Sequence, residues 1–213
     1  MAPKNKFTRE EMIAAALSVV RKNGMDKLTA KTLATELGTS TQPIFTCFGS
    51  MDTVKKEVRN AALSLFEAYL TKGLRQYIPF FGYGMQYVQF AKDEPELYRL
   101  LFLLGNRQEN RACMDAMYRA KALVRPSLIQ IYRLTADEAD RFFRDVWLVA
   151  HSLAVLVVID GCPYSEQEIG KILTGSAVSS IKAIKELDGY VDGTFDRDKV
   201  FRALIAGKDG GNA

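Results

Sequence analysis

The chain of 213 residues is predicted to be all-α, and three observations predict this fold class. Apolar residues recur at spacings of three and four along most of the chain, which is typical of helices that bury one face. No stretch sustains the alternation of apolar and polar residues that indicates a half-buried strand. Capping-box spacings, Thr135 with Glu138 and Ser165 with Glu168, indicate two helix starts. We therefore expect nine or ten helices.

The first two helices are predicted before residue 40. An apolar stripe from Met12 to Val20 predicts a first helix that ends near Gly24. The second helix starts at Thr29, whose hydroxyl can cap an unpaired backbone N–H, and it buries the stripe that ends at Leu37. Gly38 then ends this helix, because glycine accepts the left-handed conformation of a sharp helix exit.

A short third helix follows at once. Thr39 or Ser40 is expected to cap it, Pro43 is tolerated in its first turn, and Ile44 and Phe48 point inward. Two helices joined by a glycine turn form either an ordinary surface corner or a helix-turn-helix, in which the second helix enters the major groove of DNA. In the second case the outward side chains meet the DNA, and these are Thr41, Gln42, Phe45 and Thr46.

The remaining helices are predicted in order along the chain. A long helix from about Ser50 joins the two parts, and Pro79, Gly82 and Gly84 are expected to interrupt the pattern before the next helix. Pro95 starts a further helix, with nearby acidic residues as capping charges. A segment over 109–132 is expected to be broken or kinked at Pro126. Two long helices follow, over roughly 136–160 and 165–188.

Charge and composition favour a soluble, cytoplasmic nucleic-acid-binding protein. Residues 1–60 hold ten Lys and Arg against six Asp and Glu, so the whole net charge of +4 lies there, with Lys4 and Lys6 as a short basic arm. Three widely spaced cysteines fit a reducing compartment. Residues 1–10 do not resemble a signal peptide. The apolar run over 146–159 is too short for a membrane-spanning helix, which needs roughly 20 residues.

Residues 7–58 resemble the DNA-binding domain of the TetR family of transcriptional regulators. The family's pattern is matched at Thr29, Leu33, Ala34, Gly38, Ser40, Phe45 and Phe48. The chain departs from it in two places, since Phe45 stands where the family usually has Tyr and Met51 where it usually has Lys. Both departures remove phosphate contacts, and Lys55 or Lys56 can supply a cation one turn later.

The larger half is similar to the ligand-sensing domain of one TetR branch, which carries a Trp followed four residues later by His-Gly. The likeness lies in residues 90–102 and 147–154, with Ser152 in place of the Gly. The resemblance implies a DNA-binding domain over 1–50 and a ligand-sensing and dimerisation domain over 51–213. It also implies DNA contacts from a set of residues in the first domain and the start of the second: Lys4, Lys6, Thr29, Ser40, Thr41, Gln42, Phe45, Thr46 and Lys55.

Trp147 and His151 share one helix face and either pack in the core or line a cavity between helices. In the second case they bind a small apolar or amphipathic ligand, with His151 as a polar handle and with Met and aromatic partners. The expected partners are Phe102, Met114, Met117 and Tyr118. A single histidine and the lack of any Cys-x-x-Cys spacing argue against a metal site, and no cofactor is expected.

The last two long helices resemble those that form the dimer interface in this family. The candidate contacts are Leu153, Val157, Ile172, Ala177 and Ile181. A homodimer places two reading helices about one DNA turn apart, so the expected DNA partner is a palindromic operator in double-stranded DNA.

The sequence therefore predicts a homodimeric regulator, a repressor that a small molecule releases from its operator. Three alternatives remain: a thiol sensor that uses Cys113 or Cys162, a protein-binding module that has lost DNA binding, and a small helical enzyme. The enzyme is disfavoured because neighbouring residues on a helix point about 100° apart, so His151 and Ser152 cannot act as base and nucleophile. No Gly-rich phosphate loop is present either.

Overall fold

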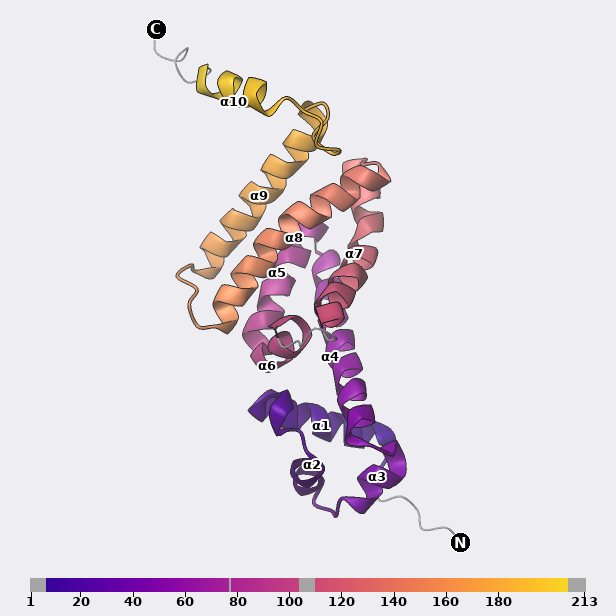
Figure 1. Cartoon of the computed structure of the whole chain (residues 1–213). Helices are drawn as coiled ribbons and strands as arrows, with labels where there is room; N and C mark the ends of the chain where they lie inside the picture. The colour runs from indigo at the N-terminus through magenta and orange to yellow at the C-terminus, as the bar shows by residue number, and fades with distance from the viewer. Residues whose placement is uncertain (1–6, 77, 104–109, 207–213) are drawn as a thin grey trace.

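The fold is all-α, as predicted, in a computed structural model that describes residues 7–76, 78–103 and 110–206. Ten α-helices and no strand are found in those residues. Figure 1 shows α1, α2 and α3 together at one end, with α4 running from them into a larger helical body. The helices are α1 Arg9–Asn23, α2 Ala30–Leu37, α3 Gln42–Phe48, α4 Met51–Leu74, α5 Pro79–Asp93, α6 Pro95–Tyr98, α7 Asn110–Tyr132, α8 Ala136–Val158, α9 Glu166–Glu186 and α10 Arg197–Ala206.

Local hydrogen bonds explain where the N-terminal helices begin and end. Thr29 caps α2 as expected, because its hydroxyl accepts from the backbone N–H of Thr32 at 3.1 Å. Gly38 ends α2 in the left-handed conformation, with φ of 62°. The expected cap of α3 is wrong. Its N-cap is Thr41, in a right-handed helical conformation and with no side-chain capping bond, so Pro43 in the first turn starts the helix without help from Thr39 or Ser40.

The expected interruption is found before Pro79, since α4 ends at Leu74, but Pro79 starts α5 and both glycines lie inside that helix and not in the break. The reason is helix packing. A Cβ on Gly82 would collide with the backbone oxygen of Gly73, and a Cβ on Gly73 would collide with the backbone of Gly82. The glycines therefore let α4 and α5 touch backbone to backbone. A proline-and-glycine pattern indicates a break only when no neighbouring helix needs the space.

Pro126 does not break α7, which the structure describes as one helix from Asn110 to Tyr132. The ring faces solvent, whereas Ala120, Val124 and Leu128 are buried on the opposite side. Packing on both sides of the proline holds the helix in one piece, although one backbone hydrogen bond is lost.

Glu96 lies in the first turn of α6, as expected of a capping charge, but Glu94 at the N-cap makes no side-chain capping hydrogen bond. Glu94 instead pairs with Arg21 of α1, with Nε–Oε2 and Nη2–Oε1 distances of 2.8 and 2.6 Å. Asp93 accepts from Tyr69 of α4 at 3.0 Å. Glu94 therefore binds α1 to the body, and Asp93 joins α4 to α5. Helix-start patterns do not reveal these tertiary roles.

A C-terminal helix, α10, was not predicted, and none of its residues is buried. The segment before it is held on α8, where the Arg141 guanidinium lies 4.5 Å from the Tyr190 ring centre and Asp145 accepts from the Tyr190 hydroxyl at 3.3 Å. Figure 1 shows α10 extending beyond the end of α9. The division at residue 50 stays a prediction, because α4 packs against α1 and α3 as well as α5.

Candidate DNA-binding face and ligand cavities

The third helix has one buried and one exposed face. Ile44 and Phe48 are buried, so they fasten α3 to the rest of the module. Gln42, Phe45 and Thr46 are exposed, and Phe45 keeps 44% of its accessible surface. The outward set predicted from the sequence therefore lies on one accessible surface.

Arg9 of α1 positions the end of α3. Its guanidinium donates to the Cys47 carbonyl at 3.3 Å and to Glu57 of α4 at 2.7 Å, and it stacks 4.5 Å from the centre of the Phe48 ring. The ion pair with Glu57 raises the pKa of Arg9. One side chain thus joins α1, α3 and α4, which keeps the exposed face of α3 in a fixed orientation.

The polar groups on this face differ in how freely they can contact a partner. The Thr46 hydroxyl donates to the Gln42 carbonyl at 2.9 Å, and the Thr29 hydroxyl is used in the α2 cap. Ser40, Thr41 and the Gln42 amide are exposed and make no side-chain hydrogen bond within the described residues. Of these five residues, Gln42 has the longest side chain, and its amide makes no hydrogen bond within the described residues.

Exposed lysines surround this module, and sequence reasoning missed two of them. Lys55 and Lys56 lie on the first turns of α4, and Lys27 and Lys31 lie on either side of the α2 start. None of the four pairs with an acid among residues 7–76, 78–103 and 110–206. Lys27 and Lys31 could have been predicted from the sequence, because they lie two residues on either side of Thr29, a predicted DNA contact. Lys4 and Lys6, the predicted basic arm, lie outside the described residues.

Three of the six predicted ligand residues come together in the body. The rings of Phe102 and Trp147 both pack on the His151 ring, with centroid distances of 5.7 Å and 4.9 Å. Met114 and Tyr118 are instead exposed on α7. Met117 is half-buried between them. The six residues therefore do not surround one point, and their ligand role stays a prediction.

His151 is held by two tyrosines. The hydroxyls of Tyr87 and Tyr98 lie 3.1 and 2.8 Å from its Nδ1 atom. Burial lowers the pKa of His151, since a charged ring would lose its hydration, and burial raises the pKa of both tyrosines. This arrangement suits a neutral imidazole that accepts at Nδ1. It resembles a satisfied core group as much as a ligand handle.

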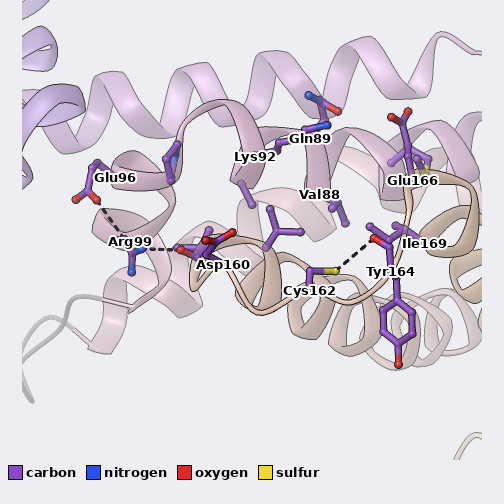
Figure 2. A pocket seen from close by; sticks show the side chains of 15 residues that line it. Val88, Gln89, Lys92, Glu96, Arg99, Asp160, Cys162, Tyr164, Glu166 and Ile169 are labelled. Carbon is purple, nitrogen blue, oxygen red and sulfur yellow. Dashed lines mark hydrogen bonds and ion pairs between the residues drawn. The ribbon is translucent and has the colours of Figure 1, made fainter.

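Two hollows in the body differ sharply in chemistry. The first, of about 480 Å³, lies between α5, α6, the end of α8 and the start of α9, and it contains charged residues of both signs (Figure 2). In it Arg99 pairs with Glu96 at 3.2 Å and donates to the Val158 carbonyl at 2.6 Å. The second, of about 350 Å³, lies between α5, α8, α9 and the end of α7, and none of its lining residues is charged.

The predicted dimer residues lie on α8 and α9, but not all of them are accessible to a partner. Leu153 is buried in the chain's own core. Val157, Ile172, Ala177 and Ile181 are half-buried, and Val157 lines the first hollow while Ala177 and Ile181 line the second. The large exposed apolar residues of the same two helices include Leu148 and Val178, which sequence reasoning did not select.

The thiols and acids offer no metal site in the described residues, where no group of three or more His, Cys, Asp or Glu side chains converges. Cys47, Cys113 and Cys162 are unpaired and half-buried. Burial raises the pKa of the Cys113 thiol, which disfavours the reactive thiolate.

Among the described helices, none combines the length and apolarity that crossing a membrane requires. A scan against protein-family models finds no match to this chain, and a search of curated proteins returns no significant relative.

Proposed function

We propose that the chain is a DNA-binding transcriptional regulator that acts as a homodimer, and that a small molecule releases it from a palindromic operator. The observation that carries the proposal is α3, a short helix with an exposed face that holds Gln42, Phe45 and Thr46. Its inner face is locked by Ile44, Phe48 and the Arg9 contacts. A rigid, outward helix with available hydrogen-bonding groups is what base reading in the major groove requires.

The charges around α3 support contact with a polyanion. Lys27, Lys31, Lys55 and Lys56 are exposed and keep their positive charge uncompensated by neighbouring acids. Phosphate contacts position a protein on a duplex, and base contacts select the sequence. We assign the lysines to the first task and Gln42, with Thr41 and Thr46, to the second.

Regulation in this proposal depends on the two copies. One three-helix module buries too little DNA surface for tight binding, whereas two modules read two half-sites. α8 and α9, which carry the predicted dimer residues, also form walls of both hollows. A ligand that prefers one arrangement of these helices shifts the population of module spacings by the difference in its affinity for them.

The test begins with a pool of random duplexes at low salt, from which the full chain should enrich a palindrome with half-sites about 10 base pairs apart. Gln42→Ala should then reduce discrimination between the selected site and a mismatched one by about 1–3 kcal/mol. Fluorescence anisotropy with labelled duplexes measures both affinities.

Lys55→Ala should weaken selected and random duplexes equally and lower the slope of log affinity against log salt by about one unit. Lys72→Ala, an exposed lysine at the opposite end of α4, is the matched control and should leave the slope unchanged. If no duplex is enriched at low salt, the chain does not read DNA sequence and the proposal fails.

A further inference from the structure

The uncharged cavity of about 350 Å³ is built from four helices. Its walls include Phe80 and Gly84 of α5, Phe142 and Val146 of α8, and a row of α9 residues that contains Ala177. Phe80, Phe142 and Val146 are buried, so these walls belong to the folded core. The volume lies at the small end of the range for ligand sites, which is roughly 300–1,000 Å³.

The chemistry of the walls excludes a charged occupant. No Asp, Glu, Lys, Arg or His lines the cavity. The hydroxyl of Thr174 already donates to the Gly170 carbonyl at 2.8 Å. Burial raises the pKa of Tyr132, so its phenol stays neutral. An ion that entered would lose hydration without gaining a counter-charge, which is costly.

The walls also favour a ring. Phe80 and Phe142 lie 4.7 Å apart, and Tyr132 lies 5.9 Å from Phe142, so three aromatic faces gather at one end. A Cβ on Gly84 would lie 3.3 Å from Leu173, so a side chain there would compete with Leu173 for the space between α5 and α9. Aromatic faces pack best against other flat or compact rings.

We propose that this cavity binds a compact, uncharged, ring-containing apolar molecule and that its occupancy acts on α9. None of the residues predicted from the sequence as ligand contacts lines this cavity. Ala177 and Ile181 serve both as cavity wall and as predicted dimer contacts. Binding itself is independent of DNA, whereas the effect on α9 rests on the proposed function.

The binding test uses two dyes with the same framework, uncharged phenylnaphthylamine and its sulfonated analogue anilinonaphthalenesulfonate. The full chain should bind the uncharged dye with blue-shifted fluorescence, and the sulfonated dye at least about tenfold more weakly because its charge must be desolvated. Equal affinity for the two dyes would show that the site does not select uncharged molecules and would overturn the assignment.

Variants then locate the bound dye. Ala177→Phe places a ring in the cavity and should weaken binding of the uncharged dye by about tenfold or more. Ser179→Phe adds the same ring to the exposed side of α9, outside the cavity, and should leave binding unchanged. Should Ala177→Phe fail to fold by circular dichroism, Thr174→Phe at the exposed rim decides instead. Folded variants of both kinds that bind like the parent would refute the cavity assignment.

The regulatory part is measured separately, by adding the uncharged dye to the preformed DNA complex. Release of DNA from the parent chain but not from Thr174→Phe, which changes a cavity-lining residue outside the predicted dimer contacts, supports it. Unchanged DNA binding of the parent chain at saturating dye refutes it. If the chain binds dye but no DNA at all, the proposed function fails while the cavity assignment stands.

Discussion

At the scale of single residues, His151 connects three elements of the body. It lies on α8, and its Nδ1 atom is shared by Tyr87 of α5 and Tyr98 of α6. Both tyrosines are fully buried, so their hydroxyls need partners inside the protein; both share Nδ1, and the Tyr98 hydroxyl also lies 3.5 Å from the His151 carbonyl. Its lowered pKa follows from burial and ties the stability of the body to pH.

We expect the free energy of unfolding to fall as pH drops below about 6.5, the ordinary pKa of histidine. The unfolded chain binds a proton at His151 before the folded chain does, so stability rises with pH in that window and is fully present above it. His151→Phe should remove this part of the slope. It should also lower stability at pH 7.5 by about 1–3 kcal/mol, since the buried Tyr87 hydroxyl loses the Nδ1 acceptor and the Tyr98 hydroxyl keeps only the backbone carbonyl of residue 151 at 3.5 Å.

Urea unfolding of the parent and the variant at several pH values between 5 and 8 measures both effects. His151 is the only histidine, so no other imidazole contributes to the difference. An identical pH slope in the two proteins would mean that the ring is protonated equally in the folded and unfolded chains.

At the scale of elements, glycines act in opposite ways according to their conformation. Gly38 has φ of 62° and ends α2, with its N–H directed at the carbonyls of Ala34 and Thr35. Gly175 lies inside α9, and a Cβ there would meet nothing within 4 Å. The first needs to be glycine, whereas the second only weakens its helix.

Gly38→Ala should therefore lower the free energy of unfolding by about 1 kcal/mol, because an alanine strains in the left-handed region. Gly175→Ala should raise it by roughly 0.5–1 kcal/mol. Thermal and urea unfolding should show changes of opposite sign in the free energy of unfolding of the two variants. A stabilised Gly38→Ala would mean that the turn before α3 differs from the structure.

At the scale of the whole molecule, the N-terminal helices are held to the body by more than α4. Arg21 of α1 and Glu94 make a two-point ion pair across this joint. Gly24 lies beside it, and a Cβ there would come within 3.1 Å of Glu96 Oε2. From the close approach and the ion pair we expect the two parts to unfold as one unit.

A double-mutant cycle with Arg21→Ala and Glu94→Ala tests this. If the parts unfold together, the cycle should give a coupling of about 0.5–1 kcal/mol in the global free energy of unfolding, a typical value for an exposed ion pair. The control cycle, Lys22→Ala with Glu36→Ala, probes a 2.8 Å pair within the N-terminal module. Coupling in the control but not across the joint would show that the parts unfold independently.

The sequence by itself determined the all-α class, the capping of α2, α8 and α9, and which face of α3 is exposed. These features depend on contacts between residues close in sequence, such as Thr135 with Glu138 or the apolar stripe that ends at Leu37. The spacing of residue types along the chain predicts such contacts.

Only the tertiary structure decided the features that depend on distant partners. Gly82 was expected to interrupt a helix, but it lies inside α5 because Gly73 of α4 approaches it. Glu94 was expected to favour a helix start, but it pairs with Arg21, seventy-three residues away. The uncharged cavity draws its walls from four helices, and no periodicity within one helix reveals which space between several will remain open.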